Sequence, residues 1–464
     1  MRTTKILLSM LVVVLVVLMV VFSVHSAAAQ TTVTTVTTVD TVRPGDTIRP
    51  GEIITRSNAP SVQAYLSPGS YALVSQGMPL RVVPSGRLDW PPPYVSATEK
   101  YSSQCSLGPR GTLHGYVAGL PFPLIDPNDP AIATKIIWNY TYRPMNSDDV
   151  DIRYPQIATY SPHNDVTPIN YLVVGHMAIY NNVGRVEVPP IPTDPDALQS
   201  GIRSKFAMFP FIEPSAMFGY GMLRYRYLDP DRADDIWMYN REARRLRRET
   251  ESAQSDPIAS PPTFGAGMGG GQFAGVANAP TAALANNLDS DSLFGFSANP
   301  ANFSYRFLGE RRMLAPVHTV EGACPNDDPL TCGQNWEIRR QYVVEADAEP
   351  GTNMAIPRRV LYVDSEGWFI AASDQYDRDG ALWKSLVNFV TYADRAAPGA
   401  RVAIYPYRRF FQVGMIDANL QDGYTTVASM PGPGVGPDSW YINMGAVDQA
   451  FFTTGNLEVA SNRP

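Results

Sequence analysis

Residues Asn335–Lys384 read NWEIRRQYVVEADAEPGTNMAIPRRVLYVDSEGWFIAASDQYDRDGALWK. Three runs rich in Tyr, Val, Ile, Phe and Trp are separated by Glu349-Pro350-Gly351 and by Asp364-Ser365-Glu366-Gly367. Alternating β-branched and aromatic residues between such turns predict antiparallel strands. The second turn predicts a short hairpin loop with Gly367 at a position of positive φ. The central unit of this chain is therefore expected to be a β-meander.

The same pattern extends along the chain on both sides of this stretch. With 41 prolines and 35 glycines, the chain favours many short strands and long loops over helical bundles. Residues 132–144 are interpreted as a first long strand or a helix turning into one, and a short helix is expected near residues 96–104. The other expected strands are residues 171–180, 185–188, 205–212, 220–228, 236–239, 244–248, 303–308, 337–346, 358–363, 368–375, 382–392, 401–407 and 423–430.

The N-terminal residues have the composition of an export signal. Arg2 and Lys5 precede an apolar run from Ile6 to Val24, and Ala27-Ala28-Ala29 offers a small-residue cleavage site. The run exceeds the usual ~7–15 residues of a signal, so an uncleaved membrane anchor is the alternative. We therefore predict a signal peptide or anchor at 1–29, a Thr/Pro-rich tether at 30–62 and a single β-rich domain at 63–464. Within that domain, the Gly/Ala-rich residues 255–287 are interpreted as a flexible insertion.

The net charge of the chain bears on whether it binds nucleic acid. The net charge is −7, and it becomes −9 if Arg2 and Lys5 are removed with the signal. This balance argues against nucleic-acid binding, which needs clustered Lys and Arg.

The chain has three cysteines. In an oxidising compartment, Cys324 and Cys332 are expected to form a disulfide, with two unpaired thiols as the alternative. Cys105 is expected to remain a buried thiol.

No set of residues typical of an enzyme or a metal site stands out. The histidines outside the signal are scattered singly, and neither an HExxH nor a GxSxG motif occurs. Gly265–Gly271 lacks the Lys-Ser/Thr of a phosphate loop and is interpreted as a linker. Residues 148–151 and 289–291 are acidic but lack the calcium-loop pattern, so we interpret them as solvated turns. We expect no catalytic residues, no metal and no cofactor, although a distant pair of carboxylates for glycoside hydrolysis stays open.

Two features suggest a binding surface. Aromatic and Met residues are dense between Phe206 and Tyr239, which suits either a packed core or an adaptable apolar pocket. The run REARRLRR, residues 241–248, suits a solvated edge or a rim facing lipid head groups or a partner's carboxylates. The candidate ligand-binding residues are Trp138, Phe209, Phe218, Met222, Tyr225, Trp237 and Tyr239 for the lining, with Arg245 and Arg247 at the mouth.

Five motifs in order resemble a known family. They are GLPFP (119–123), DIWMYNREARRLRR (235–248), DSLFGF (291–296), LGERRMLAP (308–316) and RRVLYVDSEGWFIAASDQYDRDGALWK (358–384). Together they resemble the domain-of-unknown-function 1329 family, exported proteins of Gram-negative bacteria, over about Tyr65–Met430. The family is similar in shape to the lipoprotein carriers LolA and LolB. The resemblance therefore implies a mainly β fold: a large curved antiparallel sheet, an open half-barrel, with few short helices and long loops.

The resemblance also implies a function. It points to a periplasmic protein, possibly associated with the outer membrane, that binds or carries a lipid-like hydrophobic molecule without catalysis. No Cys follows the small-residue box, which departs from LolB and argues against a lipid anchor, although peripheral membrane contact stays open. The chain is also much larger than either carrier, so its cargo need not be a lipoprotein. The alternatives are an accessory subunit of a cell-envelope complex and, third, an envelope hydrolase.

Overall fold

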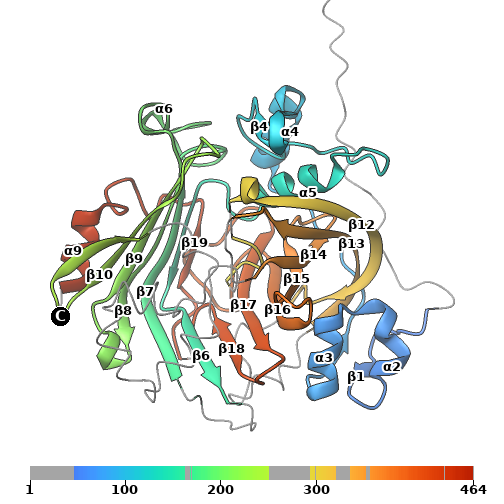
Figure 1. Cartoon of the computed structure of the whole chain (residues 1–464). Coiled ribbons are helices and arrows are strands. Elements are labelled where there is room, and N and C mark those ends of the chain that lie inside the picture. The colour runs from blue at the N-terminus through green and yellow to red at the C-terminus, as the bar shows by residue number, and fades with distance from the viewer. Residues whose placement is uncertain are drawn as a thin grey trace, which may run out of the picture. The chain divides into compact units, whose positions relative to one another are not determined.

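The computed structural model describes most of the chain after its first 45 residues (Figure 1). The described residues are 46–161, 168, 170–249, 293–297, 299–319, 335–351, 356–432 and 434–462. All of them belong to one compact unit. The export signal, the Gly/Ala-rich insertion, Cys324 with Cys332, and the acidic residues 289–291 lie outside the described residues.

Strands dominate the described part of the chain. They are β1 (Ile53–Ile54), β2 (Leu80–Val82), β3 (Ser106–Leu107), β4 (Leu113–His114), β5 (Asp149–Arg153), β6 (Gln156–Tyr160), β7 (Asn170–Asn181), β8 (Ile202–Glu213), β9 (Gly221–Tyr227), β10 (Asp235–Asn240), β11 (Arg245–Glu249), β12 (Phe303–Ala315), β13 (Asn335–Ala348), β14 (Arg358–Asp364), β15 (Ile370–Tyr376), β16 (Leu382–Ala393), β17 (Arg409–Asn419), β18 (Thr425–Ser429) and β19 (Trp440–Ile442). The helices are short: α2 (Ala59–Val62), α3 (Pro68–Gln76), α4 (Pro92–Tyr101), α5 (Ile132–Thr141), α6 (Pro195–Ser200) and α9 (Thr454–Asn462). Single 3₁₀ turns are η1 (Gln63–Tyr65), η2 (Ser102–Gln104), η3 (Pro109–Gly111), η4 (Ser215–Met217) and η6 (Pro300–Asn302).

The strands form one long antiparallel ribbon with two arms. The N-terminal arm contains β7–β11, and the C-terminal arm contains β12–β18, each strand pairing with the next. Strand β6 joins the arms, because it pairs with β7 on one side and with β18 on the other. Among the described residues, β11 and β12 are left as the two edges of an open sheet. The predicted fold class, a mainly β protein with a large open antiparallel sheet, is confirmed.

The turn between β14 and β15 shows why the hairpin forms. Asp364 Oδ1 accepts hydrogen bonds from the backbone N–H groups of Glu366 (2.9 Å) and Gly367 (2.7 Å), which closes the turn locally. The predicted positive φ at Gly367 is wrong, since Trp368 carries it with φ 57°. Gly367 is instead required for space: a Cβ there would lie 2.5 Å from the Phe369 ring.

Two predicted strands are wrong, and the segment interpreted as a strand or a helix turning into one begins as a helix. Residues 132–141 form α5, because Ile132, Ala133, Ile136, Ile137 and Tyr140 recur at helical spacing and are buried on one side. Residues 185–188 form no strand, since the backbone N–H of Arg185 bonds to Pro192 and its side chain to nearby carbonyls. Residues 401–407 form none either, because the N–H groups of Arg401 and Val402 donate to Asp438.

Helices cover the sheet at three places (Figure 1). Helix α9 lies on the outer side of β8–β10, and α4, α5 and α6 lie at the upper end of the figure. Helix α3 contacts β15 and β16, and its N-cap residue Ser67 accepts from Ser70 N–H while donating to buried Asp374 (3.1 Å). Ile48, Ile54, Ala59 and Val62 are buried in the main apolar core. The described end of the predicted tether, residues 46–62, is therefore packed, which differs from the prediction.

The acidic residues Asp148, Asp149 and Asp151 are not solvated turns, as the sequence suggested. All three are fully buried at the start of β5. The Asp148 carboxylate accepts from the backbone N–H groups of residues 186–188 at 2.6–2.8 Å, and Asp151 pairs with Arg153 at 2.9 Å. Burial raises the pKa of Asp149 to about 6. Asp148 holds the loop that follows β7, and Asp149 accepts from the Gly445 backbone N–H just after β19. These contacts explain why the carboxylates lie inside the protein.

Candidate functional site

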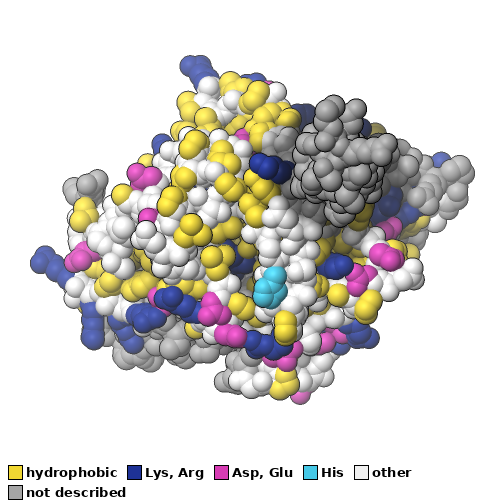
Figure 2. Space-filling model, turned by 90° about the horizontal axis from the view of Figure 1, so that it is seen from above, with side chains coloured by type: hydrophobic (Ala, Val, Ile, Leu, Met, Phe, Trp, Pro, Cys, Tyr) yellow, Lys and Arg dark blue, Asp and Glu magenta, His cyan; other side chains and the backbone are white. Residues whose placement is uncertain are grey.

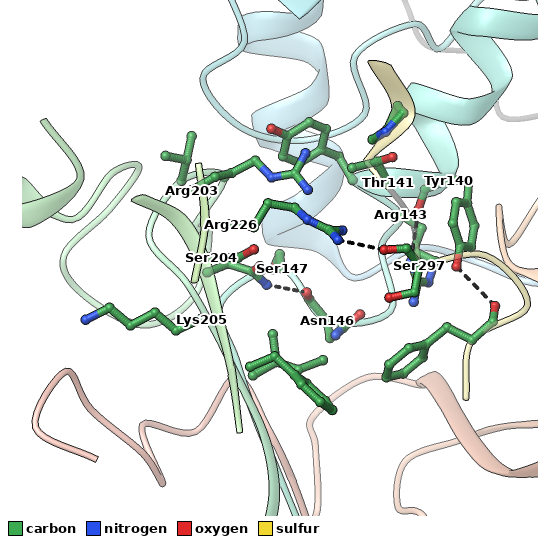
Figure 3. A pocket seen from close by; sticks show the side chains of 18 of the residues that line it. Tyr140, Thr141, Arg143, Asn146, Ser147, Arg203, Ser204, Lys205, Arg226 and Ser297 are labelled. Atoms are coloured by element: carbon green, nitrogen blue, oxygen red, sulfur yellow. Dashed lines mark hydrogen bonds between the residues drawn. The ribbon is translucent and has the colours of Figure 1, made fainter. Parts of the chain in front are cut away.

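A pocket lies where the upper end of the N-terminal arm meets α5 (Figure 3). It contains about 120 Å³ of space open to water. The walls come from Tyr116, the residues around the end of α5, the ends of β7, β8 and β9, and the segment around Phe294–Pro300. Its cationic lining residues are Arg143, Arg203, Lys205, Arg224 and Arg226, and no Asp or Glu is among the described residues that line it. This one-sided charge is unexpected in a chain of net charge −7.

The register of β8 and β9 places three of the arginines. Phe206 pairs with Arg224 and Ser204 pairs with Arg226, so alternation directs these side chains to one face of the sheet. A register shift between Ile202 and Ser204 leaves Arg203 as an extra, unpaired residue of the ladder. Such a bulge re-aims a side chain. Arg203 and Ser204 therefore both line the pocket although they are adjacent in sequence.

Two of the arginines are held by a carboxylate. Arg226 Nε donates to Asp234 Oδ2 at 2.9 Å and its Nη2 to the Ser297 carbonyl at 2.7 Å. Arg224 Nε lies 3.9 Å from the same carboxylate, and its Nη1 donates to Ser297 Oγ at 3.3 Å. The Asp234 side chain is fully buried. These two guanidiniums therefore have fixed positions in the wall.

Arg143 and Arg203 contact aromatic rings and not a carboxylate, unlike Arg224 and Arg226. Arg143 Nη1 donates to the Tyr140 carbonyl at 3.0 Å, and its guanidinium lies 4.5 Å from the centre of the Tyr140 ring. The Arg203 guanidinium lies 5.6 Å from the centre of the Tyr142 ring. Within the described part of the chain, neither forms an ion pair with a carboxylate. Both are half-buried, so their charge is only partly exposed to water.

Aromatic rings frame the cationic groups. Tyr116 and Tyr142 stack with ring centres 3.7 Å apart, and Trp138 lies 6.2 Å from Tyr142. Burial raises the pKa of both stacked phenols above the ordinary value, so they are neutral at physiological pH. The same rings line a neighbouring pocket of about 250 Å³, which shares Tyr116, Tyr142, Arg203 and Arg226 with the first.

Four predicted lining residues lie on the opposite face of the arm. Phe209, Tyr225, Trp237 and Tyr239 pack in the apolar cluster beneath the C-terminal segment and α9. Phe209 stacks on Phe451 with ring centres 4.9 Å apart, and the Tyr225 hydroxyl donates to the Phe452 carbonyl. The structure brings these residues together, but their partners are side chains of the same protein.

The other predicted residues are dispersed. Trp138 lies on α5, donates Nε1–H to the Gly111 carbonyl at 2.8 Å and lines the neighbouring pocket. Phe218 follows η4 and lies beneath the Arg241 guanidinium at 4.5 Å. Met222 packs against the main core. Arg245, which is exposed, and half-buried Arg247 lie on edge strand β11, and neither is among the residues lining the two pockets.

Sequence reasoning missed the four pocket arginines. Residues 220–228 were read as an aromatic strand, and the alternation Arg224-x-Arg226 within it is the signal that was available. Arg143 and Arg203 carry no local signal, because a helix end and a β-bulge position them. Cys105 is a free, half-buried thiol, and burial raises its pKa to about 11.

The histidines and acidic side chains of the described residues form no metal-binding cluster. No cluster of three or more His, Cys, Asp or Glu side chains there could hold a metal ion. His176 Nδ1 lies 2.8 Å from Asp151 Oδ1, and its ring packs edge-on against Phe451. Among the helices in the described ranges, none is long and apolar enough to span a membrane.

The fold and pocket define a mainly β protein with an open antiparallel sheet and a cation-lined pocket at one end. Residues 53–263 and 273–458 match the family described as "Protein of unknown function (DUF1329)". The match covers most of the chain, so the chain belongs to the DUF1329 family, as its motifs indicated.

Individual relatives are distant. An uncharacterised protein of Pseudomonas aeruginosa is 23% identical over 201 residues, which are 40% of this chain and 38% of that protein. A crystal structure named for an outer membrane lipoprotein-sorting domain of Vibrio parahaemolyticus is 15% identical, with TM-score 0.42, over 70% of this chain and 98% of that one. A DUF1329 protein of Desulfovibrio piger is 14% identical, with TM-score 0.39, over 67% and 92%. A LolA superfamily protein of Nitrosomonas europaea is 11% identical, with TM-score 0.34, over 67% and 91%.

Proposed function

We propose that this chain is an exported, non-enzymatic protein that binds or carries an amphipathic, lipid-like molecule in the cell envelope. The observation that supports this proposal is the open pocket at the end of the N-terminal arm. Ligand sites combine aromatic and apolar walls with a few polar groups that fix orientation. The pocket has this composition, since Tyr116, Tyr140, Phe206, Phe294 and Phe296 line it together with the arginines.

The pocket also adjoins apolar surface. Ile179 and Phe206 line it and belong to the main apolar core or pack against it. Burying hydrocarbon contributes about 0.8 kcal/mol per methylene group. A ligand with its polar end among the arginines and its hydrocarbon along these side chains would gain from both kinds of contact.

Native mass spectrometry and solvent extraction of protein purified from a secreting host test the proposal. We expect a co-purifying lipid-like molecule and saturable uptake of 1-pyrenedecanoic acid, a fluorescent fatty acid. Ser204→Trp places an indole in the pocket and should weaken this uptake at least about tenfold. Ser103→Trp, at an exposed position on η2, is the matched control and should bind as the native chain does. Ligand-free protein that takes up no probe would contradict the proposal.

A second candidate is an accessory subunit of an envelope complex. The observation that favours it is the packing of Phe209, Tyr225, Trp237 and Tyr239 against α9 and its flanking residues. Those aromatic residues form core beneath α9 and its flanking residues. One stable envelope partner in a pull-down, together with no extractable lipid, would support this function over the first.

A further inference from the structure

We propose that the pocket recognises the acidic head group of an amphiphile, and that Arg143 and Arg203 bind this group from different walls. This inference rests on the carrier function proposed above and specifies the chemistry of its ligand. The shared chemistry is a carboxylate or a phosphate with an attached hydrocarbon chain.

The balance of charge in the pocket is the first argument. Asp234 forms ion pairs with Arg224 and Arg226, but no carboxylate among the described residues compensates Arg143 or Arg203. A charge withdrawn from water is costly unless it is paired. Lys205 does not share this site, since it points away from the pocket in Figure 3 and donates to Gln449. A bound anion would provide the negative charge that no described residue supplies to Arg143 or Arg203.

The placement of the two guanidiniums is the second argument. Figure 3 shows Arg203 extending from β8 and Arg143 lying on the side of α5, so the two arginines line different walls of the pocket. The guanidinium is a planar fork that binds carboxylate or phosphate through two parallel hydrogen bonds. The Arg143 guanidinium lies 4.5 Å from the centre of the Tyr140 ring, and the Arg203 guanidinium lies 5.6 Å from that of Tyr142. Each fork therefore lies beside an aromatic ring, and no carboxylate of the described residues binds it as Asp234 binds Arg224 and Arg226.

The size of the pocket is the third argument. Sites for whole drug-sized ligands have volumes of roughly 300–1,000 Å³. The space of about 120 Å³ is too small for a long hydrocarbon chain and suits a compact acidic group. Most of the hydrocarbon would then extend past Ile179 and Phe206 to the outside of this space.

The surface around the site gives the fourth argument. Seen from above, basic and acidic side chains are mixed with scattered hydrophobic ones (Figure 2). Cations therefore do not dominate that face as they dominate the pocket lining. Arginine side chains that cluster in a pocket but not on the surrounding face favour binding of a small anion over binding of an extended polyanion.

The test compares two probes that differ only in the head group. Binding of 1-pyrenedecanoic acid and of the neutral 1-pyrenedecanol is measured by fluorescence near neutral pH. We expect the acid to bind at least about tenfold more tightly than the alcohol, because hydrogen bonds to charged groups are strong. Arg143→Gln and Arg203→Gln should each weaken acid binding about tenfold and change alcohol binding less than about twofold. Arg203→Lys should recover part of the loss because it restores the charge.

Controls separate the possible outcomes. Arg401→Gln, at an exposed position outside both pockets, should leave both affinities unchanged. Equal affinity for acid and alcohol, or glutamine variants that bind the acid normally, would overturn the inference while the carrier function stands. If neither probe binds, the carrier function itself fails. Millimolar inorganic phosphate is the third ligand: phosphate binding without uptake of either probe would identify a site for a free anion and overturn the inference.

Discussion

Arg203 in the N-terminal arm differs from Lys384 and Arg339 in the C-terminal arm in how its charge is accommodated. In the C-terminal arm, Lys384 Nζ lies 2.9 Å from Asp417, and Arg339 lies 2.8 Å from Asp364 and 3.0 Å from Glu366. In the N-terminal arm, Arg203 lines an open pocket and faces an aromatic ring. A basic residue on a strand therefore does not by itself indicate whether its role is structural or ligand binding. The presence or absence of a nearby carboxylate separates a structural cation from a candidate ligand-binding one.

The largest expected effect is in the C-terminal arm. Lys384→Met leaves the fully buried Asp417 carboxylate without its cation and should lower the free energy of unfolding by about 4 kcal/mol. The double variant Lys384→Met with Asp417→Leu removes both charges and should regain most of this loss. Urea denaturation measures both values. Equal stability of the single and double variants would show that the pair is not a coupled structural unit.

The next effect concerns pH and the contact between α3 and the C-terminal arm. Burial raises the pKa of Asp374 to about 6, so the folded protein favours the protonated carboxyl. This contribution to stability is complete below the ordinary pKa and disappears as pH rises through about 6, a difference of about 2–3 kcal/mol. Asp374→Asn stays neutral and should make Tm less dependent on pH between about 4 and 6. Exposed Asp379→Asn is the control, and a parallel Tm profile for Asp374→Asn would contradict the assignment.

A smaller effect is expected on the outer face of the N-terminal arm. A Cβ at Gly221 would lie 2.5 Å from Phe209 Cβ and 2.7 Å from Leu457 Cδ1. Gly221→Ala should therefore lower the free energy of unfolding by about 2 kcal/mol through overpacking. Leu457→Ala added to this variant should relieve part of the clash. Gly436→Ala, where no atom lies within 4 Å of the added Cβ, should be neutral in the same denaturation series.

The smallest effect separates edge arginines from pocket arginines. Arg245 is exposed on β11 and outside the pocket lining. Arg245→Gln should change stability by less than about 0.5 kcal/mol. It should also change the affinity for 1-pyrenedecanoic acid less than about twofold, unlike Arg203→Gln. A tenfold loss of affinity for Arg245→Gln would show that the mouth of the site extends to β11, as its sequence suggested.

Most strands could be predicted from the sequence because their pattern is local. Residues 335–384 form three strands near the expected positions, since alternation and turn residues act over a few neighbours. For the residues of α5 the sequence predicts either a strand or a helix, because their β-branched side chains also suit a strand. The helical spacing of its buried residues becomes decisive once the structure shows that this side of α5 packs against the C-terminal arm.

The candidate site depends on non-local information. Arg203 reaches the pocket through a bulge defined by the pairing of β8 with β9, and its ring partner Tyr142 lies far away in sequence. The aromatic residues Phe209, Tyr225 and Trp237 were interpreted as ligand contacts because composition does not show which face a covering segment occupies. Residues 451–457 cover that face, and no pattern near β8 signals them.

The covering of the outer face by α9 has a consequence for biogenesis. The ribosome makes β8–β10 well over 200 residues before Leu457, and β6 before its partner β18. During that interval the nascent chain exposes an aromatic surface and an unpaired strand edge, and both promote aggregation. Residues 451–457 then cover this surface. Deleting them should lower the yield of folded protein more than their number suggests.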